Sequence, residues 1–153
     1  MHKPIMYFEN NLAGSMNLFK MMEKYDCKNF IFSSTAGVYG DKDNCTETDD
    51  KHPLSPYGES KLGVEMLLGS LGKAHPDWRI ISLRYFNPCG GHESGLLGDE
   101  PLEYPNNLFP YIQEVLIGKR SKLVVFANDY PTPDGTCIRD YIHIYDLGTY
   151  EFK

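Results

Sequence analysis

The spacing of apolar side chains in the first half of the chain predicts two helices. From Glu9 to Lys24, apolar residues recur every three or four positions, the pattern of a helix with one buried stripe. The stripe consists of Leu12, Met16, Phe19 and Met22. A second such pattern begins at Pro56, and proline fits the first turn of a helix. We expect this second helix to end between Gly72 and Pro76.

Short apolar runs predict the strands. Residues 29–34, NFIFSS, and residues 78–85, WRIISLRY, are rich in aromatic and β-branched side chains. Residues 123–126, LVVF, are a third predicted strand, which follows a predicted helix over residues 107–117. Polar stretches and stretches rich in glycine and proline are interpreted as loops: residues 40–55 and 88–105.

The predicted elements follow one another as helix, strand, helix, strand, helix and strand. This order is typical of an α/β protein with a parallel sheet. The sequence contains no internal repeat, low-complexity tract or evident linker. We therefore expect residues 1–153 to form a single domain or a part of one.

The charge balance bears on the partners of the chain. The net charge is −6 and the Lys and Arg residues form no cluster, which argues against nucleic acid and anionic membrane surfaces as partners. No apolar run approaches the roughly 20 residues of a membrane helix. The first residues, MHKPIMYFENN, lack the apolar centre of a secretion signal. We expect a cytoplasmic protein.

Cysteine and histidine residues give no indication of a metal site. The four cysteines include no C-x-x-C pair, so we expect free thiols in a reducing compartment. The histidines show no ligand spacing, and we expect structural roles for them. These residues are Cys27, Cys45, Cys89, Cys137, His2, His52, His75, His92 and His143.

Tyr57 and Lys61 lie four residues apart at the start of the second predicted helix, and therefore on one face of it. Lowering the pKa of a tyrosine from about 10 to about 7 requires about 4 kcal/mol of preferential stabilisation of the phenolate. A nearby cation in a partly desolvated cleft, helped by a second one, supplies energy of this order. The spacing is typical of a tuned acid/base pair, although many such pairs are only solvated surface contacts.

The first predicted strand gives this pair a context. It ends in SSTAGVYG, where the hydroxyl groups of Ser33, Ser34 and Thr35 precede small residues. Open α/β sheets bind their ligands at the carboxyl ends of the strands. This end of the strand is therefore where we expect Tyr57 and Lys61 to act.

Six segments extend this reading over most of the chain, from about Lys3 to Leu147. They are NFIFSSTAGVYGD, SPYGESK, LRYFNPCGGHESG, PNNLFPYI, VVFANDYPTPDGT and IRDYIHIYDL. In order and approximate spacing, they resemble the UDP-galactose (UDP-glucose) 4-epimerases of the extended short-chain dehydrogenase/reductase group. The resemblance implies an α/β fold that is part of a Rossmann-type, doubly wound parallel sheet.

Enzymes of that family interconvert UDP-glucose and UDP-galactose with NAD as cofactor and act in galactose metabolism. The resemblance implies that Tyr57 removes the proton from the sugar 4-hydroxyl while the C4 hydride moves to NAD, leaving a 4-keto sugar. It implies that Thr35 shares a hydrogen bond with this oxygen and with Tyr57. Lys61 would hold the nicotinamide ribose and lower the pKa of Tyr57.

The resemblance also implies binding residues. Those near NAD are Asn11, Ser33, Tyr57, Lys61 and Tyr85. Those near the UDP-sugar are Thr35, Ala36, Gly37, Tyr85, Phe86, Asn87, Asn106, Asn107, Leu108, Val124, Val125, Phe126 and Arg139. Simpler alternatives are a strand-end cap for Thr35, core packing for Tyr85 and Phe86, a helix cap for Asn106 and a surface charge for Arg139.

The sequence departs from the family pattern in several places. Thr35 stands where a serine is usual and Gly37 where a threonine is usual, and Cys89 and Gly91 also differ. The sequence contains no G-x-G-x-x-G fingerprint for the dinucleotide pyrophosphate. We therefore expect residues 1–153 to be a fragment, lacking the N-terminal NAD-fingerprint unit and the C-terminal part, and inactive alone.

Two other readings remain open at this point. One keeps the reductase fold but makes the enzyme a sugar-nucleotide dehydratase or a uronate or pentose 4-epimerase. The other is a truncated product without activity that binds the full-length enzyme, whose family is expected to form homodimers. The sequence leaves open whether N-acetylated UDP-hexosamines are substrates.

Overall fold

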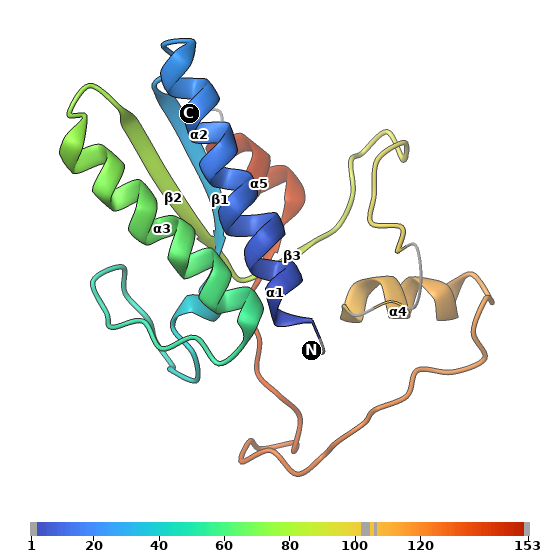
Figure 1. The fold of residues 1–153 in the computed structure, drawn as a ribbon. Helices are drawn as coiled ribbons and strands as arrows, with labels where there is room; N and C mark the ends of the chain where they lie inside the picture. Colours follow the sequence, from blue (N-terminus) through green and yellow to red (C-terminus); the bar gives the residue numbers. More distant parts are fainter. Residues whose placement is uncertain (1–2, 102–104, 106, 152–153) are drawn as a thin grey trace. The chain divides into compact units, whose positions relative to one another are not determined.

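The computed structural model describes residues 3–101, 105 and 107–151. Their contacts divide the chain into two compact units, one within residues 1–85 and the other within residues 86–153 (Figure 1). The sequence led us to expect one partial domain over residues 1–153.

The first unit begins with one long helical stretch. It consists of α1 (Pro4–Tyr7), a π-helical segment (Phe8–Ala13) and α2 (Gly14–Lys24). The prediction that this helix starts at Glu9 was wrong, because Pro4 occupies the first turn and fixes a helical backbone there. The wide turn of the π segment lies near the middle of the stretch, a feature often found at functional sites.

Strands β1 (Asn29–Thr35) and β2 (Arg79–Tyr85) pair in parallel, as the sequence predicted. In this register Asn29 lies opposite Arg79, and Thr35 lies opposite Tyr85. Both strands therefore end at the same edge. Helix α3 (Pro56–Ala74) connects them, and its bounds confirm the second predicted helix.

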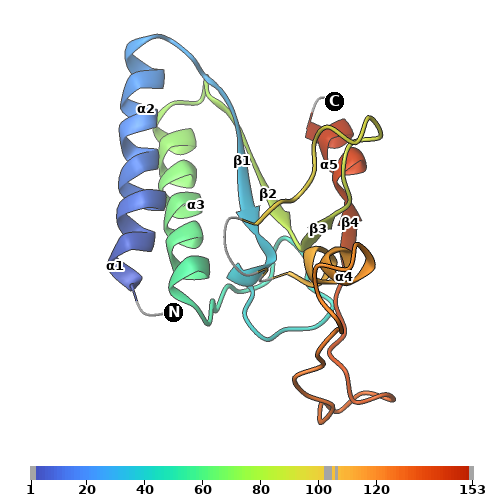
Figure 2. The same ribbon diagram turned by 90° about the vertical axis from the view of Figure 1, so that its right-hand side faces the viewer.

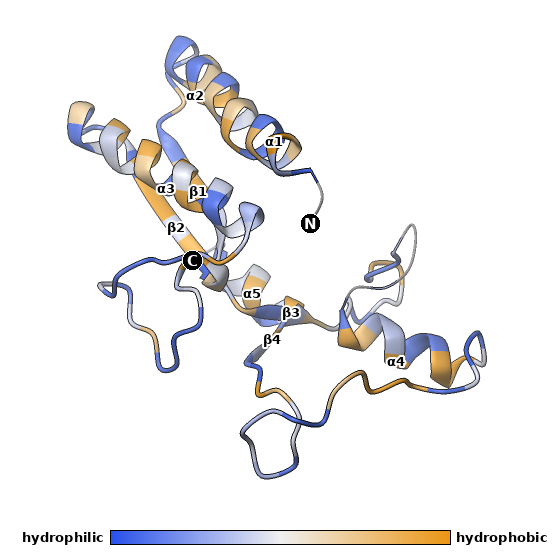
Figure 3. Cartoon of the chain, turned by 60° about the horizontal axis from the view of Figure 1, so that its bottom comes forward, coloured by the Kyte–Doolittle hydropathy of each residue, from blue (hydrophilic) through white to orange (hydrophobic). Residues whose placement is uncertain are grey.

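Helices α2 and α3 cover one face of this two-stranded sheet (Figure 2). Alternate strand residues face the helices, and Figure 3 shows the apolar colouring that runs along β2. The core between the layers consists of Phe19, Met22, Phe32, Val64, Leu68 and Trp78, with Leu12, Phe30, Leu67, Leu71 and Ile80 packed against them. This packing holds the ends of β1 and β2 in place beside α3.

The second unit contains a smaller parallel pair. Strands β3 (Asn87–Cys89) and β4 (Tyr141–His143) pair directly, and helices α4 (Leu108–Leu116) and α5 (Ile144–Glu151) complete the unit. Helix α4 confirms the helix predicted over residues 107–117. The loop predicted over residues 88–105 was wrong at its start, because β3 occupies that position.

The strand predicted at residues 123–126 was wrong. These residues form coil, and Phe126 is 87% exposed. A strand requires a neighbouring backbone to accept and donate its hydrogen bonds. Among the described residues, the pairings are those of β1 with β2 and of β3 with β4, so this apolar segment has no partner strand.

Candidate active site

The first turn of α3 places Tyr57 beside the end of β1. The Ser55 hydroxyl caps the helix by accepting a hydrogen bond from the Gly58 N–H at 3.1 Å, and Pro56 follows the cap. A Cβ atom on Gly58 would lie 2.8 Å from the Gly37 carbonyl oxygen. Glycine at this position therefore lets α3 approach the turn that follows β1.

Replacing Gly58 by alanine is expected to force this turn and the helix apart. Overpacking of this kind lowers the free energy of unfolding by about 1–3 kcal/mol. Gly69 of the same helix is the matched control, because a Cβ atom there meets nothing within 4 Å. Gly69→Ala should raise stability, since alanine is about 1 kcal/mol better than glycine in a helix. Urea denaturation measures both variants, and a Gly58→Ala chain as stable as the wild type would contradict this packing.

Thr35 is the last residue of β1 and holds the turn Ala36–Val38 through its side chain. Its hydroxyl oxygen accepts a hydrogen bond from the Gly37 N–H at 3.1 Å. The same side chain also hydrogen-bonds the Tyr57 phenol. The cap and the contact with Tyr57 coexist in one side chain, and the role of Thr35 toward a sugar hydroxyl stays a prediction.

Lys61 lies one turn after Tyr57 and reaches the same strand end. Its ammonium donates a hydrogen bond to the Ser33 carbonyl oxygen at 2.9 Å. It also lies 5.0 Å from the ring centroid of Phe32 and 5.8 Å from that of Tyr57. The structure therefore brings together the tyrosine, the lysine and the hydroxyl-bearing strand end that the sequence singled out.

The protonation of this pair follows from burial. Desolvation raises the pKa of Tyr57 and outweighs the opposing hydrogen bond with Thr35. Desolvation also lowers the pKa of Lys61. The pKa of Tyr57 is therefore shifted in the direction opposite to the lowering by Lys61 that we expected from the sequence. Burial has the largest effect on this pKa. At neutral pH the phenol is protonated, and it requires another nearby cation to act as a base.

Other predicted residues of this unit lie around the pair. The Asn11 amide donates to the Ser60 hydroxyl at 2.9 Å, and that hydroxyl donates to the Tyr57 carbonyl at 2.8 Å. This chain of bonds ties the π-helical segment to the first turn of α3. Tyr85 lies across from Thr35 in the strand register.

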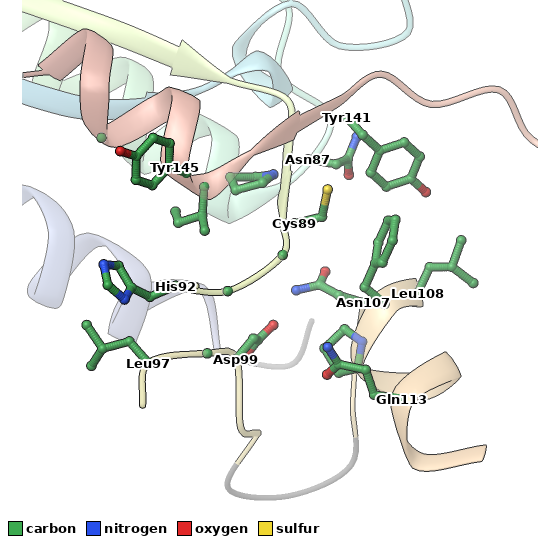
Figure 4. A pocket seen from close by; sticks show the side chains of 18 of the residues that line it. Asn87, Cys89, His92, Leu97, Asp99, Asn107, Leu108, Gln113, Tyr141 and Tyr145 are labelled. Carbon is green, nitrogen blue, oxygen red and sulfur yellow. The ribbon is translucent and has the colours of Figure 1, made fainter. Parts of the chain in front are cut away.

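The second unit contains a pocket of about 1040 Å³ (Figure 4). Four of the predicted substrate-binding residues line it: Phe86, Asn87, Asn107 and Leu108. Phe86 is 47% exposed, which excludes simple core packing for it. The structure therefore gathers in one cavity residues that lie some twenty positions apart in the sequence.

Polar and aromatic side chains both line the pocket. The Asn87 amide donates to the Asp140 carbonyl at 2.8 Å, which holds its side chain at the strand pair. Asn107 is the cap residue of α4, but its side chain makes no capping hydrogen bond. Phe109 and Tyr141 meet edge to face at 5.3 Å. Amide groups, aromatic faces and a helix N-terminus together suit a ligand with a planar ring and an anionic group.

Further polar or aromatic residues line the pocket and were missed by sequence reasoning. They include His92, Asp99, Phe109, Gln113, Tyr141, Tyr145 and Thr149. The spacing of Tyr145, Gly148 and Thr149, all in the pocket wall, is that of one helix face and was the available signal. The positions of His92 and Asp99 depend on loop geometry, for which the sequence has no periodic pattern.

Some predicted residues lie apart from the pocket wall. Val124, Val125 and Phe126 are exposed coil residues, and the Arg139 guanidinium donates to the Ile138 carbonyl at 2.6 Å. Their assignment to the UDP-sugar stays a prediction. The predicted residue Asn106 lies outside the described residues.

Neither a metal site nor a membrane helix is found in the described part of the chain. Over residues 3–101, 105 and 107–151, no group of three His, Cys, Asp or Glu side chains is placed to hold a metal ion. His143 instead packs against Gly90, whose φ of +90° and lack of a Cβ atom leave room for the imidazole. None of the helices in these ranges has the length and apolar character needed to cross a membrane.

The chain is similar to known sugar-nucleotide epimerases. The pea (Pisum sativum) protein named bifunctional UDP-glucose 4-epimerase and UDP-xylose 4-epimerase 1 is 51% identical over 146 residues, which are 94% of this chain and 42% of the relative. UDP-glucose 4-epimerase 3 of rice (Oryza sativa subsp. japonica) is 53% identical over 94% of this chain and 39% of its own length. The chain thus spans less than half the length of these relatives.

Solved structures show the same likeness. The crystal structure of UDP-glucose 4-epimerase from Bifidobacterium longum, in complex with NAD⁺ and UDP, matches with a TM-score of 0.91 and 46% sequence identity. The match covers 98% of this chain and 46% of that one. These similarities confirm the resemblance seen in the sequence and the expected fold class, part of a Rossmann-type α/β sheet. A family model described as the NAD dependent epimerase/dehydratase family matches residues 1–150, and the chain belongs to this family.

Proposed function

We propose that the chain carries the proton-transfer centre and a sugar-nucleotide pocket of a UDP-glucose 4-epimerase, which interconverts UDP-glucose and UDP-galactose. The observation that carries this proposal is the contact of Tyr57 and Lys61 with Thr35 and Ser33 at the end of β1. An epimerase requires a group that removes and returns the proton of one sugar hydroxyl. The phenol, the ammonium and the threonine hydroxyl supply that group.

The acid/base step follows from this geometry. A sugar hydroxyl beside Thr35 and Tyr57 is within reach of both oxygens, so its proton passes to the Tyr57 oxygen. The positive charge of Lys61 favours the phenolate that accepts it. The same tyrosine then returns the proton, so the reaction neither consumes nor releases a proton overall. Thr35 holds the sugar oxygen, which is a carbonyl oxygen between the two steps.

The hydrogen-bond donors beside the end of β1 fit the nicotinamide riboside part of NAD. An ammonium has three N–H donors, and among the described residues Lys61 uses one of them, on the Ser33 carbonyl. The other two suit the hydroxyl groups of a ribose. When bound, NAD supplies the hydride acceptor for the sugar carbon and a positive charge near Tyr57. Lys61, Tyr57 and Tyr85 are the residues that would hold it.

The pocket of the second unit is proposed to bind the UDP part of the substrate. Asn87 and Asn107 offer amide groups, and the N-terminus of α4 favours an anionic group such as a diphosphate. UDP-xylose is a second candidate substrate, because the pea relative is named for that activity too. We further propose that the protein acts in galactose metabolism in the cytoplasm, as a homodimer.

Nucleotide binding tests this proposal without depending on turnover. Isothermal titration of the chain with UDP-glucose, UDP-galactose and UDP-xylose is expected to show binding, whereas ADP-glucose should bind far more weakly. Asn107→Ala should weaken UDP-glucose binding roughly three- to tenfold, the value of one net hydrogen bond. Asn17→Ala, at an exposed position of α2, is the matched control and should bind like the wild type.

Two results would reject the proposal. One is equal affinity for ADP-glucose and UDP-glucose, which would remove the uridine preference. The other is UDP-glucose binding that Asn107→Ala leaves unchanged, which would place the nucleotide outside this pocket.

A further inference from the structure

A largely buried ion pair joins α3 to β2. The Arg84 guanidinium donates to both carboxylate oxygens of Glu65, from Nη2 at 2.7 Å and from Nε at 3.1 and 3.2 Å. The side chains of Arg84 and Glu65 are only 18% and 9% exposed. Such a two-pronged contact fixes the angle as well as the distance between its partners.

Further hydrogen bonds extend the ion pair to other segments. The Ser34 hydroxyl of β1 donates to the Glu65 carboxylate. Arg84 Nη1 donates to the Tyr39 hydroxyl at 2.7 Å and to the Glu47 carbonyl at 3.1 Å. The pair therefore binds both strands, α3 and the loop that follows β1 into one arrangement.

Glu65 lies on the same face of α3 as the proposed acid/base pair. Tyr57, Lys61 and Glu65 are spaced by four residues each, and positions at this spacing line up along a helix. Their partners are consecutive residues of β1. Tyr57 contacts Thr35, Lys61 contacts the Ser33 carbonyl, and Glu65 contacts Ser34.

The three contacts differ in strength. Those of Tyr57 and Lys61 are single hydrogen bonds, and Tyr57 is 41% exposed. The Glu65 carboxylate is largely buried and accepts several charge-assisted hydrogen bonds. Such hydrogen bonds are about twice as strong as those between neutral groups. The register of α3 on β1 is therefore set mainly at Glu65.

We propose that Glu65, held by Arg84 and Ser34, is a positioning residue that keeps Lys61 on the Ser33 carbonyl and Tyr57 on Thr35. This inference rests on the proposed acid/base function of Tyr57 and Lys61. Glu65 acts through those two residues, because its own carboxylate is already occupied by Arg84 and Ser34.

Stability alone does not account for this pair. Replacing a buried ion pair by apolar residues of similar volume is often neutral or stabilising. Its neighbours on α3, Val64 and Leu68, belong to the apolar core, so apolar residues would fit this position. Apolar contacts lack direction, whereas the ion pair defines one register.

The test separates an effect on the position of Lys61 from an effect on the stability of the fold. The double variant Glu65→Leu/Arg84→Met keeps the net charge and the buried volume but removes every directional bond. Glu65→Asp keeps both charges and shortens the side chain by one methylene. The control is Lys28→Gln/Asp77→Asn, which removes an ion pair of 2.6 Å whose side chains are 36% and 56% exposed. The pKa of Lys61 is measured in each full chain by NMR of the labelled lysine, alongside thermal stability.

The wild-type chain should show a Lys61 pKa below the ordinary 10.5, because burial lowers it. In Glu65→Leu/Arg84→Met the pKa of Lys61 should rise toward 10.5 as the ammonium leaves the strand end, even if thermal stability is preserved. Glu65→Asp should shift the pKa of Lys61 in the same direction. If the double variant does not fold, the result for Glu65→Asp tests the inference by itself. The control should match the wild type. A folded variant whose Lys61 pKa stays at the wild-type value would overturn the inference.

This titration requires neither NAD nor a UDP-sugar. A chain that fails to bind UDP-glucose but shows the shifted Lys61 pKa would reject the proposed function and keep the role of Glu65 in placing Lys61. A chain that binds UDP-glucose normally with an unchanged Lys61 pKa in the variants would reject the role of Glu65 alone.

Discussion

Replacing Arg84 by methionine is expected to lower the free energy of unfolding by about 3–5 kcal/mol, the usual effect of removing one partner of a buried ion pair. The variant leaves the Glu65 carboxylate largely buried, with the Ser34 hydroxyl as its remaining hydrogen-bond donor and only the weaker effect of the Lys51 charge to offset its own. It also leaves the Tyr39 hydroxyl without its Arg84 donor. Urea denaturation followed by the fluorescence of Trp78, the single tryptophan, measures the change.

Arg79→Met is the matched control for this prediction. Arg79 lies on the same strand, but its side chain is exposed. Surface substitutions away from special features usually change stability by less than about 0.5 kcal/mol. If Arg84→Met and Arg79→Met lose similar, small amounts of stability, the buried pair does not hold the two strands and α3 together.

The effect of Arg84→Met should also depend on pH. Burial raises the pKa of Glu65, but the hydrogen bonds from Arg84 and Ser34 outweigh it, and the net pKa is lowered below 4.5. A carboxylate with a lowered folded-state pKa stabilises the fold fully above its unfolded-state pKa, and this contribution is lost as pH falls through the folded-state value. The difference in stability between the wild type and Arg84→Met should therefore be largest near neutral pH and shrink below pH 4.5.

The elements of the first unit could be predicted because each one buries a long apolar pattern. Strands β1 and β2 are seven residues each and contribute to one core with α2 and α3. The start of the first helix was missed because Pro4 begins a turn without any buried residue. Strands β3 and β4 are three residues each and pair across more than fifty positions, too short for an apolar pattern to reveal them.

The site was predictable where it depends on local spacing. The helix places Tyr57 and Lys61 on one face, and the strand end places Thr35 and Ser33 at its edge. The partners of Lys61 and Glu65 depend on the register of α3 on β1, which no local pattern encodes. The direction of the Tyr57 pKa was missed for a related reason, because the depth of burial follows from tertiary packing.

Lys61 is expected to act on the protonation of Tyr57 through its positive charge. Its ammonium lies 5.8 Å from the ring centroid, and a cation at this range stabilises the phenolate over the phenol. Burial already raises the pKa of Tyr57 in the chain. Replacing Lys61 by methionine removes the cation but keeps an apolar side chain of similar length, so the pKa of Tyr57 should rise further.

Lys73→Met provides the comparison, because Lys73 lies in the last turn of the same helix, far from Tyr57 in sequence. It should leave the pKa of Tyr57 unchanged. Tyr57 has the Thr35 hydroxyl as its other polar partner at this site, and that hydrogen bond lowers its pKa. Thr35→Val should therefore also raise the pKa of Tyr57, in the same direction as Lys61→Met.

The most direct test of the acid/base centre is the titration of Tyr57, observed by NMR of chain labelled at the tyrosine Cζ carbon and assigned with Tyr57→Phe. The account predicts a pKa above 10 in the wild type that rises further in Lys61→Met and in Thr35→Val but not in Lys73→Met. A Tyr57 that titrates at its ordinary value of 10 in all four chains would show that its phenol lies away from Lys61 and Thr35, and would contradict the proposed centre.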